Sequence, residues 1–344
     1  PSDHFYEMML SLFFSGLLPG LLLVGSFFVS SVAAAPGVIE GRILNGTLPE
    51  QNAAVKEITL YRIKENQSPE KLDSQEPQEG RYRFQGLETD PQYRYRLTAT
   101  YQGIPYFSDE ILFGQGQAQV ALRTSDLKVY EVTEDPQTIR VSRDHLILEI
   151  NDREIVATEF LLLENSSNRT VWKKNLLRFS LPEGYRDFRG PGEPIRNAGG
   201  QGGEGFWLGE PVLPGNNNQI LFTYRLDFSG TQQDLFKSID YSTAQLDLMV
   251  ADKGLEIQSP NLSFQGKVDM NGQGFLRWSA SNLKPGASIR LSLSKSAMTR
   301  YLYPGGVVAI VLLLAGAGFA YTRVKARNTK RASLSSPSPP LEGR

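Results

Sequence analysis

The feature that most constrains the fold of this chain is an alternation of apolar and polar side chains with a period of two residues. In residues 93–99, Tyr, Leu and Ala alternate with Arg and Thr, and in residues 246–250 Leu and Val alternate with Asp and Met. Because successive side chains of a β-strand point to opposite faces of its sheet, this pattern predicts antiparallel strands with one buried face. Between the two terminal apolar segments, no stretch shows a helical period.

Turn-forming residues separate these runs. The chain contains 32 Gly and 20 Pro, residue types that favour tight turns. Short runs of this kind occur at Asn45-Gly46, Glu79-Gly80, Leu213-Pro214-Gly215-Asn216, Asn271-Gly272 and Lys284-Pro285-Gly286. Many short strands with turns between them predict an all-β chain of tandem antiparallel β-sandwiches, of the immunoglobulin-like or transthyretin-like kind.

These patterns divide the chain into six segments. We predict an N-terminal signal peptide or hydrophobic segment, a first β-sandwich, a second β-sandwich, a third β unit, a transmembrane helix and a basic, disordered cytoplasmic tail, at residues 1–35, 36–124, 125–230, 231–297, 301–322 and 323–344. The third unit is short for an independent sandwich. It either shares a core with the second unit or forms a separate domain, and the sequence leaves both alternatives open.

The first β-sandwich has the clearest motif. Residues 80–87 read G-x-Y-x-F-x-G-L, and the following strand, residues 93–103, contains Y-x-L-x-A. Earlier strands are predicted around residues 41–43 and 58–61. Tyr82, Phe84 and Leu87 are expected to point into the core, while Gly80 and Gly86 permit tight turns beside the strand.

This succession of strands resembles the carboxypeptidase regulatory-like family, a small transthyretin-like β-sandwich, over residues 37–124. The resemblance implies a fold rather than an activity, because such modules occur as accessory domains in many exported proteins. A polar insertion at residues 64–78, rich in Glu, Gln, Ser and Pro, departs from the family pattern. It is predicted as a solvated loop, with a partner-binding loop as the alternative.

A second resemblance concerns the whole chain. The second and third β units carry the phrases L-P-x-G, L-P-G followed by F-x-Y-x-L, and L-x-P-G, and an apolar segment follows them. This order is similar to a group of uncharacterised bacterial membrane-anchored β-sandwich proteins. The resemblance implies membrane anchoring and carries no established activity.

Residues 301–322 contain no charged side chain. At 1.5 Å per residue, a helix over this range is roughly 33 Å long, enough to cross the ~30 Å hydrocarbon layer of a bilayer. The expected flanking residues are Tyr301, Tyr303 and Tyr321 at the interfaces and the basic Arg323, Lys325, Arg327, Lys330 and Arg331 behind them. The positive-inside rule then predicts a single-pass type I membrane protein with a periplasmic or extracellular ectodomain and a cytoplasmic C-terminus.

The N-terminal segment supports the same topology. Residues 8–32 are apolar apart from Ser, Gly and Pro, and they run into small residues. Val32 and Ala34 fit signal-peptidase cleavage before Ala35. Residues 1–7 contain Asp3 and Glu7 and lack the usual basic residues, so an uncleaved first helix, giving two spans, is the alternative.

Composition argues against several classes of site. The formal net charge is −1, and the ectodomain without the basic tail is mildly acidic, so nucleic-acid binding is not expected. The chain has no Cys and two His, His4 and His145, of which His145 is expected on an exposed strand face. We therefore predict no catalytic residue, no metal site and no cofactor, and a protein that is not an enzyme.

One glycine-rich stretch offers candidate binding residues. Gly200, Gly202 and Gly205 match G-x-G-x-x-G, but no helix is predicted after them, so residues 189–205 are expected to be a mobile loop rather than a dinucleotide site. The candidate ligand-contact aromatics beside it are Tyr185, Phe188, Phe206 and Trp207. Packing of these aromatics in the core is the alternative.

The function predicted from the sequence is a non-enzymatic envelope protein whose ectodomain binds or scaffolds a partner. The expected partners are the lipid bilayer, through the C-terminal helix, and either an envelope protein or a glycan. Two alternatives remain: a carbohydrate-binding surface protein that uses the aromatics named above, and an assembly or accessory factor for a membrane enzyme complex.

Overall fold

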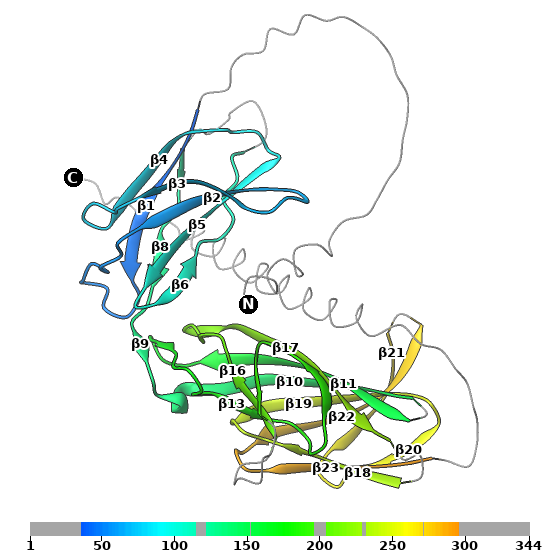
Figure 1. Ribbon diagram of the computed structural model, residues 1–344. Helices are drawn as coiled ribbons and strands as arrows, with labels where there is room; N and C mark the ends of the chain where they lie inside the picture. The colour runs from blue at the N-terminus through cyan, green and yellow to red at the C-terminus, as the bar shows by residue number, and fades with distance from the viewer. Residues whose placement is uncertain are drawn as a thin grey trace, which may run out of the picture. The chain divides into compact units, whose positions relative to one another are not determined.

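The computed structural model describes residues 36–114, 122–151, 153–195, 204–228, 232–270 and 272–295. Apart from one 3₁₀ helix, η1 (Pro136–Thr138), the elements formed by these residues are β-strands, so the all-β prediction is confirmed (Figure 1). The predicted signal segment, the transmembrane helix with its flanks and the tail lie outside the described residues. In the ranges given, no helix is long and apolar enough to span a bilayer.

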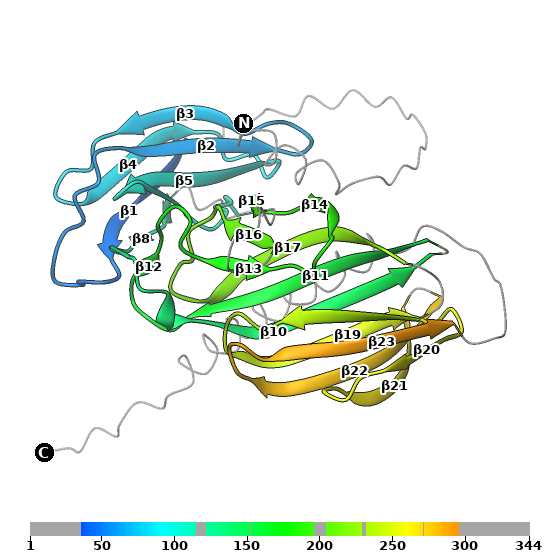
Figure 2. The ribbon, with the colours of Figure 1, turned by 60° about the horizontal axis from the view of Figure 1, so that its bottom comes forward.

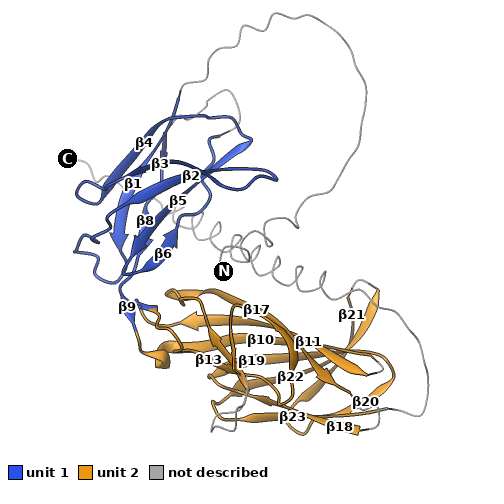
Figure 3. Cartoon of the chain, in the orientation of Figure 1, with its two compact units in different colours: residues 1–133, 168–170 blue, residues 134–167, 171–344 orange. Residues whose placement is uncertain are grey.

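The chain divides into two compact units (Figure 3). Unit 1 comprises residues 1–133 and 168–170, and unit 2 comprises residues 134–167 and 171–344.

Unit 1 contains two four-stranded sheets. The first has the order β4 (Arg81–Leu87), β1 (Gly37–Asn45) and β7 (Leu122–Thr124), with β8 (Leu127–Val129) also paired to β1. The second has the order β3 (Glu70–Gln75), β2 (Ile58–Lys64), β5 (Tyr93–Tyr101) and β6 (Ile104–Phe107). The strands predicted around residues 41–43, 58–61, 80–87 and 93–103 are therefore confirmed.

The core of unit 1 holds the residues that the motif placed there. Tyr82, Phe84 and Leu87 are buried. Phe113 links the two sheets. Its ring meets the ring of Tyr95 on β5 edge-on, with the ring centroids 5.6 Å apart. The same ring covers Gly37 of β1, where an added Cβ would lie 2.5 Å from the nearest ring atom. This close approach explains the glycine at the start of β1.

The polar insertion differs from its prediction. Residues 64–78 were expected to be a solvated loop, but β3 lies within them and pairs antiparallel with β2. The Thr59 and Ser74 hydroxyls lie 2.9 Å apart across this ladder. The loop was predicted from the polarity of the side chains. The segment forms a strand because its backbone N–H and C=O groups pair with those at the edge of β2.

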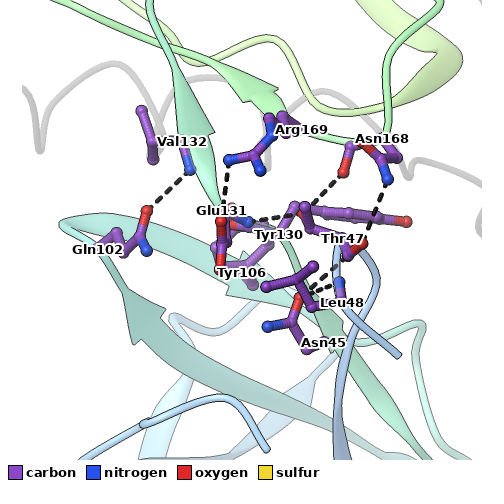
Figure 4. Close-up of polar contacts among 10 residues, drawn as sticks. All are labelled: Asn45, Thr47, Leu48, Gln102, Tyr106, Tyr130, Glu131, Val132, Asn168 and Arg169. Atoms are coloured by element: carbon purple, nitrogen blue, oxygen red, sulfur yellow. Dashed lines mark hydrogen bonds and ion pairs between the residues drawn. The ribbon is translucent and has the colours of Figure 1, made fainter. Parts of the chain in front are cut away.

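Residues 168–170 form part of unit 1 through polar contacts (Figure 4). The Thr47 hydroxyl donates to the Asn168 carbonyl at 2.7 Å and accepts from the Glu131 N–H at 2.9 Å. The Asn168 amide donates to the Thr47 carbonyl, and Arg169 pairs with the Glu131 carboxylate at 2.9 Å. The two-residue strand β9 (Val132–Thr133) pairs with β12 (Thr170–Val171) beside this cluster.

Unit 2 is built on one seven-stranded sheet. Its order is β14 (Arg186–Arg189), β17 (Gly215–Asp227), β11 (Glu154–Asn165), β10 (Ile139–Ile150), β19 (Thr243–Ala251), β22 (Gln273–Leu283) and β21 (Ser263–Met270). In β10, Leu146, Leu148 and Ile150 point to one buried face, as predicted. β19 differs from the prediction, because residues 246–251 are buried on both faces and Met249 packs with Ile147 and Phe275 away from the main core.

Two three-stranded sheets complete unit 2. One has the order β13 (Arg178–Ser180), β16 (Gly205–Leu208) and β15 (Gly192–Ile195), and the other β18 (Gln232–Ser238), β23 (Ser288–Lys295) and β20 (Leu255–Gln258). Figure 2 shows β23 against β19 and β22. Side chains of all three sheets belong to one apolar core, which makes unit 2 a β-sandwich.

The predicted second and third β units contribute to this same core. Leu161 and Phe222 come from residues 125–230, and Leu248 and Leu291 come from residues 231–297. The reason is the pairing of β10 with β19, which places strands from both segments side by side in one sheet.

Not every strand pair is antiparallel. β10 runs parallel to β19, and β1 runs parallel to β7 and β8. The prediction of purely antiparallel sheets is therefore too simple. Parallel neighbouring strands need a long connection between them. In each of these pairs the chain forms other strands before it returns to the sheet.

The shared core predicts how fragments of unit 2 behave. A fragment of residues 134–295 should unfold cooperatively in urea, whereas residues 134–230 alone should not, because β10 would lose β19 and the sheet of β18, β23 and β20. Amide NMR dispersion and urea titration measure both outcomes. A cooperatively folded 134–230 fragment would contradict a single core.

Candidate functional site

The predicted ligand-contact aromatics lie in or against the core of unit 2. Tyr185 and Phe206 are fully buried, and Phe188 packs against Phe206 with ring centroids 4.9 Å apart. Trp207 is half-buried on β16. Tyr185 and Phe206 therefore follow the alternative prediction, packing in the core, because a ligand cannot reach side chains that have no exposed surface.

Part of the glycine-rich stretch forms strand rather than the predicted loop. β15 lies within residues 189–205 and pairs with β16, which begins at Gly205, so residues 192–195 and 205 are strand rather than loop. Gly192 and Gly205 meet the backbone of neighbouring strands so closely that an added Cβ would lie 2.0 and 2.2 Å from a carbonyl oxygen. Residues 196–203 lie outside the described residues. The glycines at the ends of the stretch thus serve strand packing.

His145 occupies the face opposite Leu146, as predicted, but it is not exposed. Its side chain is 14% accessible and stacks beside Phe160, with ring centroids 6.3 Å apart. Its Nδ1 lies 3.8 Å from the Asp247 carboxylate, beyond hydrogen-bond distance. Burial lowers the pKa of His145. Asp247 is instead held by Arg277, whose Nη2 donates at 2.6 Å. This face of the sheet therefore contains a neutral histidine packed beside the ion pair of Asp247 and Arg277.

The most unusual group of side chains lies between the sheets of unit 2. It consists of Asp144 on β10, Glu159 on β11 and Lys237 on β18, and we call it the buried Lys–carboxylate cluster. The Lys237 ammonium lies 3.0 Å from the Asp144 carboxylate and also donates to Glu159. The exposed fractions of the three side chains are 4% for Asp144, 5% for Glu159 and 15% for Lys237.

Strand geometry explains why these side chains meet. Asp144 precedes Leu146 by two residues, and Glu159 precedes Leu161 by two, so both carboxylates project from the core face of the large sheet. On β18, Phe236 is exposed, and its two neighbours, Leu235 and Lys237, point to the opposite face of the strand. This face is directed into the core. The ammonium therefore approaches the carboxylates from the facing sheet.

The electrostatics of the cluster are dominated by burial. Desolvation raises the pKa of Glu159 to about 8 and raises that of Asp144, although Lys237 opposes both shifts. Lys237 keeps its proton because the two carboxylates raise its pKa against the effect of desolvation. Burial also raises the pKa of Tyr224. Lys237 thus supplies one positive charge to two carboxyl groups, so it can neutralise only one of them when both are ionised.

The hydrogen bonding of the cluster is incomplete. Asp144 Oδ1 is buried and has no hydrogen-bond partner. A cavity of about 20 Å³ adjoins the cluster and is lined by Asp144, Glu159, Lys237 and Asp240, which is room for about one water molecule. Asp240 is itself fixed, since its carboxylate accepts from the Ser180 N–H and hydroxyl, both at 2.6 Å.

The arrangement brings together an amine, two carboxyl groups and a water-sized space in an apolar surrounding. Such a group can hold and exchange protons internally, and it can fix the relative position of two sheets. Sequence reasoning missed it. The signal was present, because Asp144 and Glu159 stand at core-facing positions of largely apolar strands, where a charged residue is almost never fully buried without a partner.

Comparisons with known proteins identify no family. No family model matches the chain, and no curated protein matches it. Among solved structures, an M1 zinc metallopeptidase from Deinococcus radiodurans has 9% sequence identity and a TM-score of 0.29, covering 45% of this chain and 42% of that one. A mutant of a two-domain M1 zinc metallopeptidase bound to L-tryptophan gives 9% and 0.28, covering 46% and 43%. The chain thus spans less than half the length of these proteins, and the likeness is too weak to support an argument.

The cluster predicts a large effect from removing its cation. Lys237→Met should lower the free energy of unfolding of unit 2 by about 3–5 kcal/mol, because two buried carboxyl groups lose their partner. Urea unfolding monitored by tryptophan fluorescence measures the change. Lys267→Met is the matched control, since Lys267 pairs with Asp252 at 2.6 Å but is 62% exposed, and its loss should cost less than about 1 kcal/mol. Equal effects of the two substitutions would contradict the structural role of the cluster.

The raised pKa of Glu159 predicts a pH dependence. The folded chain holds a proton on Glu159 where the unfolded chain, with a pKa of 4.5, has released it. The free energy of unfolding should therefore fall as pH rises from about 4.5 to about 8, and Glu159→Gln should flatten this decline. Urea titrations across that window test it. A wild-type stability that rises steadily over this range, with no difference in slope for the variant, would contradict the burial of a protonated Glu159.

Proposed function

We propose that this chain is a non-enzymatic, membrane-anchored envelope protein whose ectodomain scaffolds a protein partner. The observation that carries the proposal is the packing of unit 2, in which three sheets share one core and a buried charge cluster fixes two of them against each other. A body of this kind holds its surface in a constant shape, which is the property that a scaffold requires.

The surface of unit 2 supports a protein partner. Leu221, Phe236 and Phe264 are large apolar side chains that remain 43–57% exposed. Aromatic side chains are enriched in the centres of protein–protein interfaces. Phe264 is held in place by Trp278, with ring centroids 5.1 Å apart, so it presents a fixed apolar contact. This arrangement favours a protein over a glycan, because the aromatics Tyr185 and Phe206 are enclosed in the core.

Membrane anchoring enters the proposal from the sequence. The apolar segment at residues 301–322 is long enough to span a bilayer, and the basic residues after it favour a cytoplasmic C-terminus. The two β-sandwich units then lie in the periplasm or outside the cell, attached through the C-terminal end of unit 2.

The proposal predicts both membrane retention and a specific contact. The full-length protein should stay with membranes after alkaline washing, because its anchor is a spanning helix. A photoreactive residue in place of Phe264 or Phe236 should give a discrete cross-linked product in cells, detected by a size shift on denaturing gels.

A photoreactive residue in place of Glu256, an exposed charged position on β20, is the control and should give little product. Release of the protein by the alkaline wash would contradict the anchor. The absence of any product at both aromatic positions, with the protein folded and membrane-bound, would contradict the scaffold.

A further inference from the structure

The buried Lys–carboxylate cluster has the composition and geometry of a reactive site. Lys237 carries an amino group, Asp144 a carboxyl group whose Oδ2 lies 3.0 Å from Nζ, and Glu159 a second carboxyl group that accepts a hydrogen bond from the same nitrogen. We propose that Lys237 and Asp144 join spontaneously in an amide bond between their side chains, with Glu159 moving the protons. The product is a covalent cross-link between β18 and β10.

Proximity is the first argument. Two reacting groups held at about 3–3.5 Å gain a large rate advantage over the same groups free in solution, because the entropy of bringing them together is already lost. Here the two strands belong to different sheets, and the core on both sides prevents the side chains from moving apart. Folding of unit 2 therefore supplies the encounter.

The choice of Asp144 as the partner follows from hydrogen bonding. Oδ1 of Asp144 has no hydrogen-bond partner, so this carboxyl group has an unsatisfied oxygen in the core. Glu159 lies against the lysine nitrogen, in the position of a proton acceptor and donor. Amide formation replaces the buried ammonium and carboxylate with a neutral group, which an apolar interior favours.

The reaction needs an amine, since an ammonium group has no lone pair. In the resting cluster Lys237 keeps its proton, so the reaction starts with an unfavourable step: while Glu159 is protonated, Nζ transfers a proton to the Asp144 carboxylate, which gives an amine and two carboxylic acids. No net charge is left in the core by this transfer. The remaining groups that face the cluster are Tyr224, which stays protonated, and Asp240, which is occupied by Ser180.

The bond changes then balance. The Nζ lone pair attacks Cγ of Asp144, the C–N bond forms, and the carbonyl oxygen takes the proton of Glu159 while Nζ returns one to it. Glu159 next protonates one hydroxyl of the tetrahedral intermediate, the C–O bond breaks, and water leaves. The other hydroxyl gives its proton to Glu159 as the carbonyl reforms. An amine and an acid have become an amide and a water molecule, and no oxidant or other reactant is needed.

The structure accommodates the released water. The cavity beside the cluster, about 20 Å³, has space for about one water molecule. Once that water has left, the low exposure of the Asp144 and Glu159 side chains, 4% and 5%, limits the access of solvent to the amide and so opposes its hydrolysis. The chain has no Cys, so this link would do what a disulfide does in other exported proteins, closing a loop of roughly 90 residues in the unfolded chain.

Mass spectrometry of the full-length protein purified under denaturing conditions tests the proposal. After digestion, the peptides that contain Lys237 and Asp144 should appear as one linked species, lighter than their sum by the mass of one water. Fragmentation should assign the link to these two residues. Lys237→Arg and Asp144→Ala should abolish the linked species, and Glu159→Gln should reduce it at least tenfold.

Lys267 is the internal control. It lies 2.6 Å from Asp252 but is largely exposed, so its peptides should remain unlinked in the same digest. Wild-type peptides of unchanged mass for both Lys237 and Asp144 would overturn the proposal, and this result does not depend on whether any variant folds. A link from Lys237 to Glu159 would overturn the assigned partner, and a wild-type yield in Glu159→Gln would overturn the role of Glu159. None of these outcomes depends on the protein partner proposed above.

Discussion

The contact between the Lys237 ammonium and the carboxyl groups of Asp144 and Glu159 is the constraint on which unit 2 depends. Each of these groups costs several kcal/mol to remove from water, so none can remain in the core unless the others are in place. The sheet that carries Lys237 therefore has one position against the sheet that carries the carboxylates. Apolar packing tolerates small shifts, whereas this pairing does not.

The rest of the architecture is consistent with that constraint. Strands from both halves of residues 134–295 are needed to build the cluster, since β10 and β11 come early and β18 comes late. The parallel pairing of β10 with β19 brings these halves into one sheet. In a chain without cysteine, a core made from distant segments and fixed by charge gains rigidity that disulfides would otherwise give. Such rigidity supports the scaffold role proposed above.

Much of the fold could be predicted because strand alternation is a local property. Residues 93–99 and 246–250 show the alternation directly, and both lie in strands. The polar strand β3 could not be predicted, because its stability comes from backbone pairing with β2 rather than from its own side chains. Burial of Tyr185 and Phe206 likewise depends on which strands lie opposite them. The cluster itself joins three strands distant in sequence, and only the placement of Asp144 and Glu159 on apolar faces indicated it.

Nitrogen NMR of the Lys237 side chain, assigned by comparison with Lys237→Arg, tests the central claim most directly. The account predicts one side-chain nitrogen signal that exchanges with solvent far more slowly than those of the exposed lysines, and that has the chemical shift of an amide where the link has formed. A Lys237 signal that exchanges as fast as that of exposed Lys267 would show that the ammonium is in water, and would contradict the buried cluster.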